Sequence, residues 1–167
     1  IADNRSQSLE ALINTGLCEC RMGDMADAWR CLTQARQAAA LAGDRLREAT
    51  TSWALSEWHG YTGLCDNAVA YAEAARSLAS SSRARFAEIQ ACLALGAAHL
   101  EARQPDRAIE PLGAALGGAR ALRAVHYEVS GELLMARAAL QQGRAQEAAD
   151  ALRGCLSRAT EIGARGL

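Results

Sequence analysis

The feature that most constrains this chain is a pattern of small residues that recurs every 40 positions along its 167 residues. The recurring positions hold Gly23, Gly63 and Gly143; Ala28, Ala68, Ala108 and Ala148; Gly16, Ser56, Gly96 and Ala136; and Ala35, Ala75, Ala115 and Cys155. A fixed period of this size is typical of stacked-repeat proteins, in which one supersecondary unit buries its apolar face on its neighbours. We therefore predict a single array of four units, over residues 5–44, 45–84, 85–124 and 125–164.

Each unit has the pattern of two helices joined by a tight turn. Ala28, Leu32 and Ala35 have the i, i+4, i+7 spacing of one helix face. Gly23 and Asp24 come before them, as a helix break followed by a residue suited to cap the next helix. The sequence predicts eight helices, over residues 6–22, 25–42, 46–62, 65–80, 84–102, 105–122, 126–142 and 145–162.

One predicted helix contains residues that disfavour helices. Pro111 falls inside the segment 105–122 and removes a hydrogen bond to Arg107, and Gly117 and Gly118 follow it. The alternatives are a tolerated kink in the outer layer, which we favour, and a functional hinge.

Composition and charge agree with an all-α fold and exclude several function classes. Half of the residues are apolar, only 4% are aromatic, and the formal net charge is −1. No basic stripe is present, so we expect no direct contact with nucleic acid. No apolar run approaches the roughly 18 residues of a membrane span, and no signal peptide opens the chain, so we expect a cytoplasmic protein without membrane contact. The first residue is Ile1 rather than methionine, which suggests a fragment of a longer protein.

The cysteines and histidines do not form a site pattern. The six cysteines include no CxxC motif, and Cys18 and Cys20 would point to different faces of a helix, so we expect small buried side chains and no metal. His59 and His99 occupy the same repeat position, with Glu19 one unit earlier, and a hydrogen-bonded core histidine is favoured over a metal ligand. No catalytic motif is present, and we predict a protein that is not an enzyme, with no catalytic residues and no cofactor.

The units follow a pattern in which an apolar residue stands beside a small one, a glycine marks the turn, and alanines flank a large residue in the second helix. The first unit shows this as Thr15-Gly16, Gly23, Ala28, Leu32 and Ala35; the third as Leu95-Gly96, Ala108, Leu112 and Ala115; the fourth as Met135-Ala136, Gly143, Ala148, Leu152 and Cys155. The second unit, with Leu55-Ser56, Gly63, Ala68, Ala72 and Ala75, has an alanine at the large position. With these residues the chain resembles the tetratricopeptide repeat family, in a variety with helices longer than those of the usual 34-residue unit. Arg103 replaces the turn glycine of the third unit.

The resemblance implies a right-handed α-solenoid of four helical hairpins, with the first helix of each hairpin on the concave face and the second helix outside. It also implies a ligand groove on the first helices. Trp53, Glu57 and Tyr61 would share one stripe of one helix, because they are spaced i, i+4, i+8. The flanking positions in the next two units are Leu93, Leu133 and Arg137.

This mostly apolar groove would suit an amphipathic helix or an extended apolar segment of a partner protein. We expect replacement of Trp53 with alanine to weaken binding tenfold or more with a modest loss of melting temperature. The alternative is that these residues pack against neighbouring helices.

Two functions follow from the resemblance. The first is a non-catalytic scaffold that binds proteins or peptides. The second is a ligand- or partner-sensing segment of a larger bacterial transcriptional regulator, similar to the arrays of MalT-like and large LuxR-type proteins. Repeat arrays need capped ends, so we also expect Leu152 and Leu156 to be covered by a further segment or by a second copy through self-association.

Overall fold

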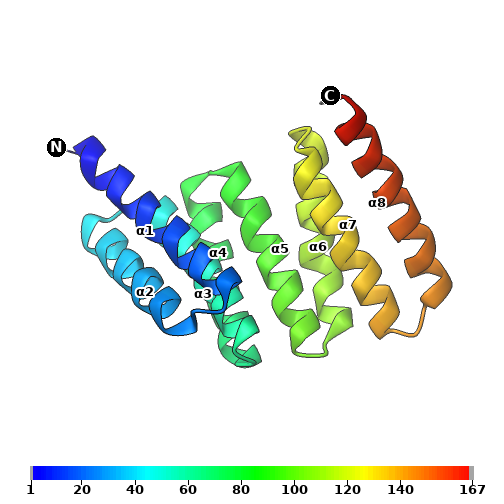
Figure 1. Ribbon diagram of the computed structural model, residues 1–167, viewed down its shortest axis with the longest axis horizontal. Helices are drawn as coiled ribbons and strands as arrows, with labels where there is room; N and C mark the ends of the chain where they lie inside the picture. Colours follow the sequence, from blue (N-terminus) through cyan, green and yellow to red (C-terminus); the bar gives the residue numbers. More distant parts are fainter. Residues whose placement is uncertain (1, 166–167) are drawn as a thin grey trace.

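The computed structural model describes residues 2–165, and the side chains of residues 7–158 and 160, as an array of helices without a strand (Figure 1). Eight helices are described: α1 (Ala2–Met22), α2 (Met25–Ala42), α3 (Arg45–Tyr61), α4 (Cys65–Ser82), α5 (Arg85–Glu101), α6 (Pro105–Ala121), α7 (Val125–Gln141) and α8 (Ala145–Arg165). The predicted all-α solenoid of eight helices is confirmed. Helix α6 continues through Pro111, which is buried.

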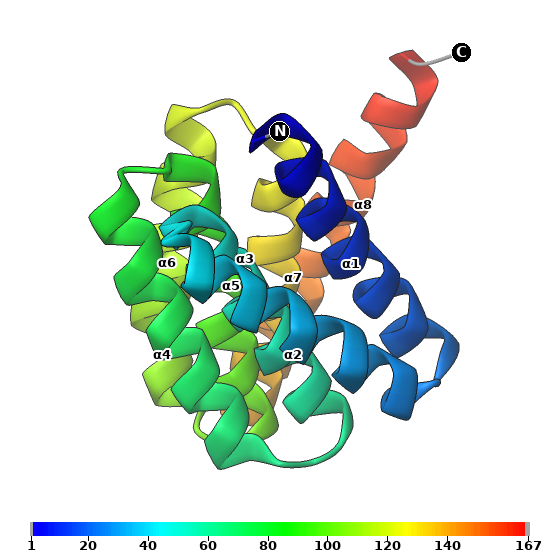
Figure 2. The ribbon, with the colours of Figure 1, turned by 90° about the vertical axis from the view of Figure 1, so that its left-hand side faces the viewer.

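The helices form two layers, which we call the A helices (α1, α3, α5, α7) and the B helices (α2, α4, α6, α8). The backbone of each A helix lies close to that of the next A helix, whereas the backbone of each described B helix lies close only to its neighbours in the chain. Figure 2, which faces the N-terminal end, shows α4 and α6 on one side and α1 and α7 on the other. Because successive A helices lie closer together than successive B helices, the array curves toward the A helices. The right-handed sense of the superhelix stays a prediction.

The core between the layers is made largely of alanine. In α2, Ala28, Leu32, Ala35 and Ala39 are completely buried, and this spacing recurs in α4 and α6. Small residues let the helices approach closely. A Cβ atom built on Gly96 of α5 would lie 2.4 Å from Leu112 Cδ2 of α6, so the Leu112 side chain occupies the space that a side chain at position 96 would need.

The seven described turns show that the backbone repeats every 20 residues, twice as often as the sequence pattern. Each turn has one residue with positive φ: Gly23, Gly43, Gly63, Arg83, Arg103, Arg123 and Gly143. At most turns the next N–H donates to the carbonyl five residues earlier, as Gln104 does to His99 at 2.8 Å, which satisfies a carbonyl at the helix end. The predicted cap at Asp24 is confirmed, since its side chain accepts from the Asp27 N–H. Arg103 adopts φ 57°, so an arginine takes the left-handed conformation that glycine takes at Gly23, Gly63 and Gly143.

The C-terminal end of the array exposes leucines that are buried one unit earlier. Leu112 and Leu116 of α6 are 0% and 9% exposed, and Leu116 packs on Gly131 of α7. Their repeat counterparts in α8, Leu152 and Leu156, are 39% and 68% exposed. No further A helix among the described residues covers them.

The N-terminal end is polar. Asn14 and Thr15 of α1 are exposed at the repeat positions that Ala94 and Leu95 occupy, buried, in α5. A head-to-tail contact between two copies would bury these polar groups against leucines, which is unfavourable without new hydrogen bonds. Self-association through the ends stays a prediction.

Candidate functional site

A groove of about 460 Å³ crosses the A helices on the inner side of the array. Its lining combines apolar side chains with polar and charged ones. The lining residues come from α1, α3, α5 and α7: Arg21, Trp53, Glu57, Gln90, Leu93, Ala94, Ala97, His126, Tyr127, Ser130, Leu133 and Leu134. A second hollow of about 340 Å³ adjoins it and shares Glu57, Ala94 and Ala97 with it. We call the two hollows together the A-helix groove.

The structure brings four of the six predicted site residues together in the larger hollow: Trp53, Glu57, Leu93 and Leu133. Tyr61 lies in the adjoining hollow, next to Glu57 and 59% exposed. Arg137 lines neither hollow, because its guanidinium is 2.8 Å from Glu101 Oε1 at the edge of the second one. This pair is exposed on both sides and contributes little to stability.

Trp53 has two environments. One part of the indole lines the groove, and the other packs against three separate core clusters. The first joins α1, α2 and α3, the second joins α3, α4 and α5, and the third joins α4 and α5. Its Nε1–H is buried and has no hydrogen-bond partner in the described part of the chain. Trp53 is therefore both a groove residue and a core residue. Part of this side chain packs against neighbouring helices, which was the alternative to a groove position.

Glu57 is the unusual charge of the groove. It is half-buried, and it makes no hydrogen bond or ion pair with any described side chain. Burial raises the pKa of Glu57 above its usual range, and the positive charge of Arg21 partly offsets this. The pKa of the neighbouring Tyr61 phenol is also raised, first by burial and then by the charge of Glu57.

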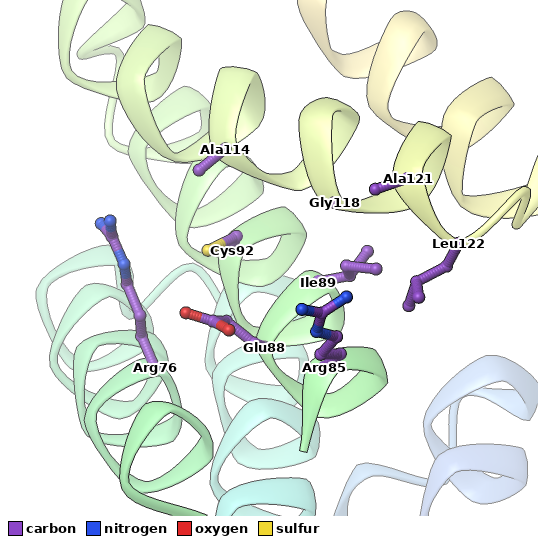
Figure 3. Close-up of a pocket in the computed structure, with 9 residues that line it drawn as sticks. All are labelled: Arg76, Arg85, Glu88, Ile89, Cys92, Ala114, Gly118, Ala121 and Leu122. Carbon is purple, nitrogen blue, oxygen red and sulfur yellow. The ribbon is translucent and has the colours of Figure 1, made fainter. Parts of the chain in front are cut away.

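A further pocket of about 330 Å³ lies between α4, α5 and α6, away from the predicted groove (Figure 3). Figure 3 shows Glu88 and Cys92 projecting from α5 toward its centre, with Arg76 on α4 beside them. Arg76 is held by two hydrogen bonds to Glu110, at 2.8 and 2.7 Å. Burial raises the pKa of the Cys92 thiol, which disfavours the nucleophilic thiolate.

Sequence reasoning did not find this pocket, although a signal was present. Its α6 side consists of Ala114, Gly118, Ala121 and Leu122, and Gly118 stands where the preceding unit has Leu78. A Cβ atom on Gly118 would lie 3.0 Å from Ile89 Cγ1. Gly118 thus departs from the repeat pattern and allows a close approach to Ile89, so comparison of the units position by position could have drawn attention to this part of the array.

Sequence reasoning also missed an aromatic cluster around His59. The imidazole stacks on Tyr71 at 4.9 Å and meets the edges or faces of Trp58 and Trp29 at 4.9 and 5.6 Å. His59 is buried and neither ring nitrogen has a partner among the described residues, so the expected hydrogen bond is wrong for this residue. The expectation is confirmed for His99, whose Nδ1 is 3.3 Å from Gln104 Oε1. The difference arises because the repeat counterpart of Gln104 is Leu64.

We expect His59 to make the chain less stable in mild acid. Burial lowers the pKa of His59, so the unfolded chain, with a pKa of about 6.5, binds the proton first as the pH falls. Stability is therefore complete above about pH 6.5 and is lost as the pH falls below it. Thermal melts of wild type and His59→Phe between pH 7.5 and 5 measure this.

The His59→Phe variant should lose that pH dependence and gain about 1 kcal/mol at pH 7.5, because two unpaired buried nitrogens are removed. His126→Gln, at an exposed histidine, is the control and should keep the wild-type profile. Parallel pH profiles for wild type and His59→Phe would show that His59 does not control the acid sensitivity.

The remaining classes of site give no candidate within residues 2–165. No group of three or more His, Cys, Asp or Glu side chains among the described residues could hold a metal ion. The cysteines described there are all free thiols. No helix in this part of the chain has both the length and the apolar character that a membrane crossing requires.

Comparison with known proteins does not assign the chain to a family. No protein-family model matches the chain, and no curated protein sequence matches it either.

Proposed function

We propose that this chain is a non-catalytic binding module of the tetratricopeptide-repeat type, whose A-helix groove holds a segment of a partner protein. The observation that carries the proposal is the continuity of the groove over three successive A helices. Trp53, Leu93 and Leu133 supply an apolar row with one residue from each of α3, α5 and α7. Such a row matches the repeating apolar side chains of an amphipathic helix or of an extended apolar peptide.

Exposure supports this use of the groove. Leu133 is 45% exposed at its edge, although α7 has helices on both sides. Exposed apolar side chains beside a concave surface, with aromatic residues in the same lining, are typical of binding sites. The surface has room for a side chain of the partner but is too open to enclose a small metabolite completely.

The proposal is tested with peptides, because the partner is unidentified. A random peptide library displayed on phage is selected on the wild-type chain, and the best peptide is titrated calorimetrically. We expect Leu133→Asp to weaken its binding at least tenfold, because a carboxylate would stand in the apolar row. The control is Leu41→Asp, which changes a leucine that is 84% exposed at the end of α2, away from the groove.

Both substitutions are at exposed positions, so melting temperatures should change little. A library that yields no binder, or a selected peptide that binds Leu133→Asp as tightly as it binds wild type, would contradict the proposal.

The second candidate function is a sensing segment of a larger bacterial transcriptional regulator. The pocket between α4, α5 and α6 favours it, because its volume of about 330 Å³ lies at the lower end of the range of small-molecule sites. The two candidates predict different ligands at different places: a peptide on the A helices, and a small molecule against Ile89 and Cys92. Ligand-dependent protection of the Cys92 thiol from alkylation would favour the sensor.

A further inference from the structure

The two glutamates of the A-helix groove differ in whether they have an ion-pair partner. Glu101 at its edge is paired with Arg137 at 2.8 Å. Glu57, which lines both hollows, has no hydrogen-bond or ion-pair partner among the described side chains. Arg21, at the end of α1, is close enough to affect the pKa of Glu57 but is not within ion-pair distance, and it is exposed to solvent. A half-buried carboxylate without a partner reduces stability, since it has lost water and gained no hydrogen bond.

The surroundings of Glu57 leave its carboxylate open to an incoming group. Glu57 lines both hollows of the groove, and on the α5 side it faces Ala94 and Ala97, which are too short to reach across. Trp53 and Tyr61 lie one helical turn before and after it on α3, on the same stripe. The site therefore combines one unpaired carboxylate with two aromatic rings beside it.

This combination is chemically selective for a cation. An ammonium or guanidinium group would neutralise the carboxylate in a partly desolvated place, where charge-assisted hydrogen bonds are stronger than in water. The faces of indole and phenol rings also attract a cation.

We propose that the segment bound in the A-helix groove carries one lysine or arginine among its apolar residues, and that this basic side chain pairs with Glu57 between Trp53 and Tyr61. This inference rests on the proposed function, because it specifies the partner of the same groove. Glu57 is then the residue that selects the partner, and the apolar row supplies the rest of the contact.

The test is a double-mutant cycle on the phage-selected peptide. Its basic residue is replaced by glutamine, and both peptides are titrated onto wild type, Glu57→Gln and Glu73→Gln. The Glu73 control removes the same charge from an exposed position of α4, outside the groove. We expect the glutamine peptide to bind wild type and Glu73→Gln at least tenfold more weakly than the basic peptide, and to bind Glu57→Gln with less than a threefold difference.

The stability of Glu57→Gln should not affect the interpretation of the double-mutant cycle. Because the folded state raises the pKa of Glu57, the ionised side chain destabilises the fold, so Glu57→Gln should melt at or above the wild-type temperature. Selected peptides that lack lysine and arginine, or an equal effect of the glutamine replacement in wild type and Glu57→Gln, would overturn the inference. If such peptides still lose affinity for Leu133→Asp, the proposed function stands without it. A library with no binder would overturn both.

Discussion

Replacing Gly96 with alanine should lower the free energy of unfolding by about 3 kcal/mol, the upper part of the range for overpacked cores. The added methyl group would lie 2.4 Å from Leu112 Cδ2 and 2.5 Å from Leu112 Cγ. These atoms cannot move away easily, because Leu112 is completely buried and packs among Leu100, Ala108 and Ala138. Relief requires that α5 and α6 separate, which disturbs the contact of both with α7.

Urea unfolding of Gly96→Ala and of Gly113→Ala measures the effect. Gly113 is also inside a helix, but a Cβ atom there would meet nothing within 4 Å. The control should therefore gain up to about 1 kcal/mol from the better helix propensity of alanine. Shortening the opposing side chain in Gly96→Ala/Leu112→Ala should couple the two sites, with a smaller combined loss than the sum. Equal stabilities for Gly96→Ala and wild type would show that α5 and α6 are not this close.

The close approach at Gly96 also shows how the sequence pattern determined the fold. The repeat position of Gly96 holds Gly16, Ser56 and Ala136 in the other units, and each of these lies where an A helix meets its own B helix. At Ser56 the hydroxyl donates to the Ala68 carbonyl at 2.8 Å, so a small polar residue also fits. A helix contact of this kind depends on residue size, which sequence shows directly. For this reason the hairpins and their limits were predictable.

The 20-residue spacing of the turns was harder to recognise in the sequence than the 40-residue repeat. Glycine marks four of the seven turns, whereas Arg83, Arg103 and Arg123 occupy the others with φ near 55°. An arginine with positive φ gives no signal in sequence, because the conformation is imposed by the packing of the helices on either side.

The candidate site was predictable only in part, for a related reason. Helical spacing placed Trp53, Glu57 and Tyr61 on one stripe, and the structure has them along the groove. The sequence did not show that Arg137 is held by Glu101, since ion pairs between units depend on side-chain directions. It also did not show that Glu57 lacks a partner, which is the property on which its proposed role depends.

Replacing Trp53 with alanine should affect stability more than the sequence alone indicates. The sequence placed Trp53 in an open groove and predicted a modest loss of melting temperature. In the structure the indole packs against three core clusters, so its removal leaves a cavity that involves α2, α3, α4 and α5. We now expect a loss of about 3 kcal/mol, the lower end for removal of a buried large aromatic side chain, because part of the ring faces the groove.

Tyr61→Ala is the matched comparison, because Tyr61 lies on the same stripe of α3 but is 59% exposed and belongs to no core cluster. It should weaken binding of the selected peptide while the free energy of unfolding changes by no more than about 0.5 kcal/mol. Trp53→Ala should reduce both quantities, with affinity measured at a temperature where the variant is still folded. A Trp53→Ala protein as stable as Tyr61→Ala would mean that the indole is not part of the core. A Trp53→Ala protein with reduced stability and unchanged affinity would mean that the partner binds elsewhere, because a peptide in the groove would lose its contact with the indole.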